Sequence, residues 1–186
     1  MMNIFDVLME EHRGFKTMLD VLEAIAARLA RNEAVPHGMV SDVLDFFELF
    51  ADRHHGKEED LLFPVLAQHG IGTDQTVVAA LMSQHEAGRA YGHKMREDLS
   101  RLRAGSAGAA ADLAAHARGY TELIREHIRI EDEYFYRLAE EVLTSAEKEA
   151  IFRQFRPGNL TTEGARDRDR YLEMLRSYPP MVADWR

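Results

Sequence analysis

The stretch DRHHGKEEDLLFP, from Asp52 to Pro64, places two adjacent histidines and two adjacent glutamates between apolar sequences. The apolar run VLDFFELF precedes it at residues 43–50, and LLFPVL closes it at residues 61–66. Charged and titratable side chains are costly to bury without a partner. A polar cluster inside an otherwise hydrophobic helix therefore indicates a polar site within the fold.

Apolar residues recur at alternating three- and four-residue steps along most of the chain. From about Asn3 to Arg31 they are Phe5, Leu8, Phe15, Leu19, Leu22, Ala26 and Leu29. His12 occupies the one missing step, and this periodicity predicts an amphipathic helix. Similar patterns predict helices over about 39–68, 74–103 and 109–143, joined by short loops that contain glycine. No segment shows the alternation expected of a β-strand.

Short loops make consecutive helices antiparallel neighbours, so the expected fold is all-α, an up-down-up-down antiparallel four-helix bundle. The bundle is expected to cover residues 1–143 of the 186-residue chain. Residues 144–186 are expected to form a short C-terminal helical extension. Thr144 or Ser145 caps its helix, with Glu147 or Lys148 in the first turn. One or two further helical turns and a tail follow.

The composition excludes several classes of function. The chain has no cysteine, which excludes disulfides, thiolate zinc sites and iron–sulfur clusters held by its own residues. The net charge of −9 argues against nucleic-acid binding, and the arginines of residues 153–176 alternate with acidic residues as on a solvated helix. No apolar run is long enough for a membrane span, and the N-terminus lacks a basic signal-peptide start. We expect a cytoplasmic protein without nucleic-acid or membrane partners, whose oligomeric state the sequence does not predict.

Four histidines fall at one depth in the expected bundle, one on each helix, because equal distances from a connecting loop mean equal depth. They are His12, His54, His85 and His127. Glu58 follows His54 by four residues and Glu131 follows His127 by four, so each pair shares a helix face. Imidazole and carboxylate without thiolate suit iron or manganese better than structural zinc. The set predicts a metal site, and the alternative is a polar core network.

The chain resembles the hemerythrin-like, HHE cation-binding family over about residues 3–143. The resemblance rests on EEHR around His12, HHGKEEDLLFP around His54, QHEAGR around His85 and EHIRIEDE around His127, in this order and spacing. It implies a non-haem di-iron centre, bridged by two carboxylates and an oxo or hydroxo group. The ligands that it implies by position are His12, His54, Glu58, His85, His127 and Glu131, with the two glutamates as bridges.

The sequence departs from hemerythrin proper on two helices. Hemerythrin has a second histidine on its third helix, where this chain has Arg89, and an aspartate on its fourth, where both Glu131 and Asp132 are available. We expect Glu131 to be the ligand because it shares the apolar stripe of its helix. The resemblance to an iron-sensing hemerythrin-like domain of eukaryotes implies that His55 replaces the missing histidine; the alternative is a residue at the rim. Glu59 is expected to lie outside the ligand set.

Other polar and small residues receive structural interpretations. The histidines expected outside the site are His37, His69, His93 and His116. Tyr120 and Tyr134 are expected on the inner face, either lining a pocket or packing in the core. Gly88 and Gly92 indicate either close helix packing or a channel to the metals, and Pro64 indicates a kink or a relaxed turn.

The resemblance implies a protein with two non-haem iron ions that binds or reacts with a small diatomic or peroxidic molecule. The expected roles are sensing of O2 or redox state, the response to nitric oxide or peroxide, or iron handling; manganese is the alternative metal. The enzyme alternative is a ferritin-like oxidase or peroxidase, although the sequence has no Glu-x2-His motif of the ferritin-like type. The remaining alternative is a metal-free helical interaction module.

Overall fold

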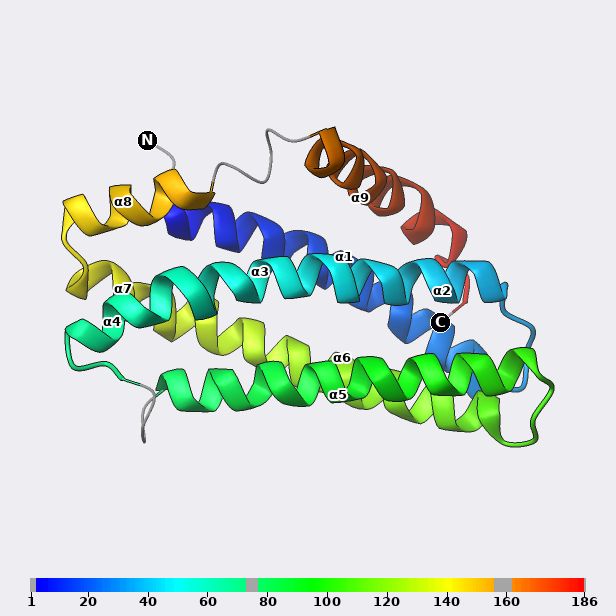
Figure 1. The fold of residues 1–186 in the computed structure, drawn as a ribbon. Helices are drawn as coiled ribbons and strands as arrows, with labels where there is room; N and C mark the ends of the chain where they lie inside the picture. The colour runs from blue at the N-terminus through cyan, green and yellow to red at the C-terminus, as the bar shows by residue number, and fades with distance from the viewer. Residues whose placement is uncertain (1–2, 73–76, 156–161, 186) are drawn as a thin grey trace.

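The computed structural model describes residues 3–72, 77–155 and 162–185, with side chains for all of these except residues 162–167 (Figure 1). Its regular secondary structure in these ranges is entirely helical, which confirms the all-α class. None of the described helices combines the length and the apolar character that a bilayer span requires.

Four long helical segments make up most of the chain. The first is α1 (Ile4–Ala30) and the third is α5 (Val77–Arg103). The second consists of α2 (His37–Phe46), η1 (Phe47–Ala51), α3 (Asp52–Lys57), η2 (Glu58–Leu62) and α4 (Phe63–Gln68). The fourth consists of α6 (Ala109–Ile130), η3 (Glu131–Phe135) and α7 (Tyr136–Val142). These bounds agree closely with the expected helices; the expected start of the third lies outside the described residues.

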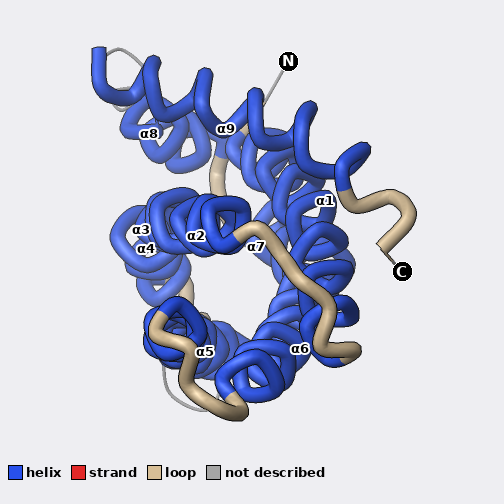
Figure 2. Tube along the Cα trace, turned by 90° about the vertical axis from the view of Figure 1, so that its right-hand side faces the viewer, coloured by secondary structure: helices blue, strands red, loops and turns tan. Residues whose placement is uncertain are grey.

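Viewed along their length, the four segments form a ring (Figure 2). The first segment contacts the second and the fourth, and the third contacts the second and the fourth as well. Each segment therefore lies beside its neighbours in the chain, as short connections require. Asn3 starts the first segment with a capping box, in which it exchanges hydrogen bonds of 2.8 and 2.9 Å with Asp6.

The core consists of two apolar clusters separated by a polar layer. One cluster includes Leu8 of α1 and Phe135 of η3, and the other includes Phe15 of α1 and Met95 of α5. His12 lies between Leu8 and Phe15 along α1 and is buried. The polar layer therefore crosses the middle of the apolar interior instead of lying at one end.

Three turns of π-helix, η1, η2 and η3, interrupt the second and fourth segments. A π-turn inserts one extra residue, so every later side chain moves around the helix by one position. On a regular helix, the stripe predicted for residues 39–68 continues from His54 and Glu58 to Leu61 and Val65. After η2, however, Leu62 and Leu66 are buried, whereas Leu61 and Val65 are only partly buried. The predicted stripe was wrong beyond Glu58 because a sequence period of 3.6 assumes an uninterrupted α-helix.

The same shift changes the fourth segment. Tyr134, expected on the inner face, is 57% exposed, and its neighbours Phe135 and Tyr136 are buried instead. The prediction for Tyr134 was wrong, while Tyr120, which precedes η3, is buried as expected. The relaxed turn expected near Pro64 is confirmed as η2, directly before the first turn of α4, where the proline lies.

The C-terminal part is more helical than expected. α8 (Ser145–Phe155) is the predicted short helix, and its capping is confirmed by the Thr144 hydroxyl, which accepts from the Glu147 backbone N–H at 3.3 Å. α9 (Thr162–Met181), expected as one or two turns, has 20 residues. Figure 1 shows it lying along the outside of the bundle, and it contacts α1.

Tyr171 anchors α9 to the bundle. Its ring packs on Phe46 and Phe50, with ring centroids 5.1 and 4.7 Å apart. Met174 is buried beside it in the apolar cluster of Phe15. The spacing of Tyr171, Met174, Leu175 and Tyr178 is that of an amphipathic helix. The expectation of a shorter extension was wrong because this stripe gains its stability from packing on the bundle.

The contact of Tyr171 with Gly14 yields a testable prediction. A Cβ atom at residue 14 would lie 1.7 Å from the Tyr171 hydroxyl oxygen. Gly14→Ala should therefore destabilise the protein by about 1–3 kcal/mol, as overpacking does. In a Tyr171→Ala background the clash is gone, and the same change should stabilise α1 by up to about 1 kcal/mol. Denaturant unfolding of the four proteins measures both effects.

Gly38→Ala is the matched control, because a Cβ there meets nothing within 4 Å. Equal effects of Gly14→Ala in the two backgrounds would show that Tyr171 does not pack on α1.

Candidate metal centre

The polar layer is built from seven buried side chains contributed by all four segments. They are His12 of α1, His54 and His55 of α3, Glu58 of η2, His85 of α5, His127 of α6 and Glu131 of η3. None is more than 6% exposed. The structure thus brings together every residue that the sequence analysis assigned to a metal site.

Four of the histidines have an acceptor beside the outward ring nitrogen, Nδ1. The pairs are His12 with Asp132 (2.7 Å), His54 with Glu11 (2.9 Å), His85 with Glu59 (2.7 Å) and His127 with Gln84 (3.1 Å). An acceptor at Nδ1 holds the proton on that nitrogen and leaves the Nε2 lone pair available to a cation. The second nitrogen of each ring is therefore prepared for metal binding.

The two glutamates lie between histidines of different segments. The separations from carboxylate oxygen to Nε2 are 3.2 Å from Glu131 to both His12 and His127, 3.8 Å from Glu58 to His54, and 3.6 Å from Glu58 to His85. Each glutamate begins a π-turn, η2 for Glu58 and η3 for Glu131. Each carboxylate can therefore serve the histidines of both sides of the layer.

Many of the polar atoms in this layer lack a partner. Those that are buried without a hydrogen bond are Nδ1 of His55, Oε2 of Glu58, Nε2 of His85, Nε2 of His127 and both carboxylate oxygens of Glu131. An unsatisfied buried polar atom costs about 1–3 kcal/mol. Bound cations would occupy these lone pairs, so the donor set fits a metal centre better than a self-contained polar network.

The donor atoms form three overlapping groups, in each of which the atoms lie within 4.8 Å of one another. The groups are His12, His54 and Glu131; Glu58, His85, His127 and Glu131; and His55, His85 and His127. Glu131 belongs to two groups, and His85 and His127 also belong to two. The layer can therefore hold more than one cation with shared ligands.

His55 belongs to the third of these groups, and it shares His85 and His127 with the second. Its ring stacks on that of His85, with centroids 3.8 Å apart, and its Nδ1 has no hydrogen bond. Arg89 is not in the donor set, because its guanidinium donates to Glu59 at 3.2 Å. The same glutamate oxygen accepts from His85. Arg89 and Glu59 therefore position His85 from outside the layer.

Tyr136 is a site residue that the sequence analysis missed. Its hydroxyl donates to Glu58 Oε1 at 2.7 Å and lies 3.5 Å from His12 Nε2. The regular helical stripe pointed to Tyr134 because it did not include the extra residue of η3. Glu11 and Gln84 were also not assigned; the only local signal for Glu11 is its position next to His12.

The other histidines lie outside the layer, as expected. His116 binds the buried Asp98 at 2.6 Å, and His69 binds Glu147 at 2.9 Å. His37 and His93 are exposed. These contacts assign structural roles to His116 and His69.

Burial controls the protonation of the layer. It raises the pKa of Glu58 to about 8 and raises that of Glu131 well above its ordinary value, and in Glu131 the nearby charge of Glu58 adds to the effect. Burial also lowers the pKa of four histidines of the layer: to about 2 for His85, and well below the ordinary value for His54, His55 and His127. A cation would therefore meet neutral imidazoles at these four histidines and would displace protons from the glutamates.

Comparison with known proteins agrees with this geometry. Residues 3–139 match the family described as Hemerythrin HHE cation binding domain, a range that exceeds half of the chain and includes all seven residues of the layer. No curated protein and no solved structure matches the chain. The chain therefore belongs to the hemerythrin HHE cation-binding family.

Proposed function

We propose that the protein holds two non-haem iron ions in the polar layer, within an up-down-up-down four-helix bundle, and binds or reacts with a small diatomic or peroxidic molecule. The observation that carries the proposal is the convergence of unpaired, buried imidazole and carboxylate atoms from all four segments. His12, His54 and Glu131 would hold one ion, and His85, His127 and Glu58 the other. His55 is the additional donor.

The chemistry of the ligands supports iron. Imidazole and carboxylate ligands suit iron and manganese, and no thiolate is present. Bound iron supplies electron transfer toward O2, nitric oxide or peroxide. Manganese is the alternative occupant, and the reactions with small molecules distinguish the two.

The protein's own residues determine how the centre would work. The acceptors at Nδ1 fix the ring orientations, which makes the site rigid. Tyr136 donates to Glu58 and leaves Oε2, the unpaired oxygen, for a cation. The two apolar clusters pack against the layer on both sides along the bundle. This arrangement suits a sensor or stress-response protein in which a small molecule reaches a buried centre.

The proposal predicts both the amount and the reactivity of iron. Protein reconstituted with ferrous iron should hold close to two irons per chain by elemental analysis, and its absorption spectrum should change when the reduced form is mixed with O2, nitric oxide or peroxide. One metal per chain, or zinc as the preferred occupant, would contradict the di-iron proposal. A spectrum unaffected by all three molecules would contradict the proposed reactivity.

Single substitutions should separate the ligands from their surroundings. His54→Ala should lose most of the iron and lower the free energy of unfolding by roughly 3–4 kcal/mol, because a ligand that binds only the folded state stabilises it. His55→Ala should retain most of the iron and shift the spectrum. His93→Ala is the matched control, since that histidine is exposed and outside the layer. If His55→Ala empties the site while His54→Ala does not, the assignment of the two adjacent histidines is reversed.

The affinity for ferrous iron should rise with pH between about 6 and 8. In this range the cation displaces protons from Glu131 and from Glu58, whose pKa is raised to about 8 by burial, while His54, His55, His85 and His127 are already neutral. Each displaced proton strengthens binding on the order of ten-fold per pH unit. Anaerobic calorimetry in buffers of different ionisation enthalpy measures the protons released. Glu58→Gln should release fewer, and an affinity independent of pH would contradict the assignment of these carboxylates.

A further inference from the structure

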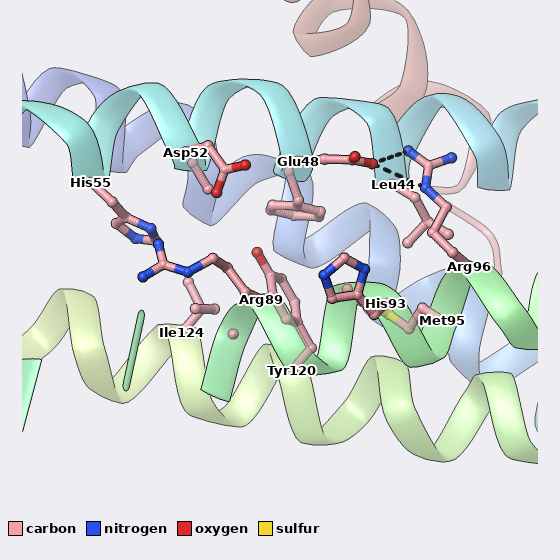
Figure 3. Close-up of a pocket in the computed structure, with 14 residues that line it drawn as sticks. Leu44, Glu48, Asp52, His55, Arg89, His93, Met95, Arg96, Tyr120 and Ile124 are labelled. Carbon is pink, nitrogen blue, oxygen red and sulfur yellow. Dashed lines mark hydrogen bonds and ion pairs between the residues drawn. The ribbon is translucent and has the colours of Figure 1, made fainter. Parts of the chain in front are cut away.

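A cavity of about 220 Å³ lies beside the metal centre, between the second, third and fourth segments (Figure 3). His55 lines its inner end, and Phe47, Tyr120 and Ile124 form much of its wall. Asp52 and other exposed polar side chains line its outer side, so the cavity opens to solvent there. A diatomic molecule, as proposed above, would occupy only a small part of this volume.

Two glycines of α5 line the cavity, and they differ in role. A Cβ atom at Gly88 would lie 3.3 Å from Cδ1 of Ile124, so this glycine allows close packing of α5 on α6. A Cβ atom at Gly92 would meet nothing within 4 Å, so this glycine leaves open space. Glycine within a helix costs about 1 kcal/mol relative to alanine. At Gly92 no packing contact offsets that cost.

Tyr120 places a hydroxyl group in this cavity. The residue is 3% exposed, and its ring packs on Phe47 with centroids 5.0 Å apart. Figure 3 shows the hydroxyl directed away from α6 into the space between the helices. It makes no hydrogen bond to any residue in the part of the chain that the structure describes. Burial raises its pKa, so the group stays protonated and can donate to an acceptor within the cavity.

The charges at the rim do not favour an anion. Arg89 donates to Glu59 at 3.2 Å, and Arg96 donates to Asp45 at 2.5 Å and to Glu48 at 2.8 Å. Both guanidinium groups are therefore paired with carboxylates of the protein. The carboxylate of Asp52 lies among them and would repel a negative ligand. The cavity is thus suited to a neutral molecule.

We propose that this cavity binds a small neutral organic molecule with an apolar body the size of one ring and an oxygen that accepts a hydrogen bond from Tyr120. An apolar cavity of about 150 Å³ takes up benzene, so a single ring with a hydroxyl group fits the available volume. Aromatic side chains on the wall favour a planar ring. Phenol is the simplest molecule of this class.

The position of the cavity connects this ligand with the metal centre. A smaller space of about 10 Å³, which touches His12, His54 and His127, shares Phe47 and His55 with the cavity wall. A bound molecule would therefore lie next to the polar layer. Binding of this molecule depends on the cavity alone. A reaction of the bound molecule at the metal centre would depend also on the proposed function.

A pair of matched probes tests the binding. 4-Fluorophenol and fluorobenzene differ by the hydroxyl group, and their fluorine NMR signals report binding to the purified, iron-loaded protein. Tyr120→Phe should weaken the binding of 4-fluorophenol roughly 3- to 10-fold, the effect of one lost hydrogen bond, and should change the affinity for fluorobenzene by less than about two-fold. Gly92→Leu should fill the cavity and abolish binding of both probes. Ala90→Leu, on the exposed face of the same helix, is the control and should bind both.

Several results would overturn the proposal. The first is the absence of saturable binding of 4-fluorophenol to the unchanged protein. The second is an equal loss of affinity for both probes in Tyr120→Phe, and the third is undiminished binding of the probes to Gly92→Leu. A new charge-transfer absorption with 4-fluorophenol would place the phenol on the iron and would equally overturn it. If Gly92→Leu does not fold, Gly92→Ala adds one methyl group to the same space and should weaken both probes. Iron content, measured in each variant, tests the proposed function separately.

Discussion

The burial of two carboxylates between two apolar clusters is the constraint on which the rest of the structure depends. Glu58 and Glu131 are fully buried, with oxygen atoms that no hydrogen bond satisfies. Burying them as anions would require compensating positive charge, and no lysine or arginine reaches them in the described residues. Burial favours the neutral, protonated form of a carboxyl group, and the pKa values of both glutamates are therefore raised. Cations held by the surrounding histidines would supply the compensating charge.

A ring of polar contacts around the layer holds the histidine side chains in place. Carboxylates and one amide at the surface of the bundle hold the outward nitrogens of four histidines. Some of these acceptors are held in turn by cations: Asp132 by Lys16, Glu11 by Lys57 and Glu59 by Arg89. The lysine and arginine side chains of these contacts therefore stay at the rim, while the layer itself consists of imidazoles and the two glutamates. Arg89, at the position where hemerythrin proper has a histidine, belongs to this outer ring.

The π-turns explain how two glutamates can share one layer with histidines of four helices. Two of them, η2 and η3, begin at a glutamate and widen the helix where its carboxylate enters the layer. π-turns of this kind occur often at functional sites. The extra residue rotates the side chains that follow it around the helix axis. In the fourth segment Tyr136 is therefore buried, and Tyr134, which a regular helix would place inside, is exposed. One extra residue in the helix thereby changes the apolar packing of the turn beyond it.

The sequence by itself determined the helices and the depth of the four histidines, because apolar periodicity and loop length are local properties. It also placed Glu58 and Glu131 correctly on the faces of His54 and His127, since four residues make one helical turn. The tertiary structure decided what lies beyond those glutamates, because a π-turn leaves no mark in the apolar pattern. It also decided the contacts of Tyr136, Glu11 and Gln84, the docking of α9 and the cavity at Tyr120. These features join residues far apart in the chain, and only packing between segments brings them together.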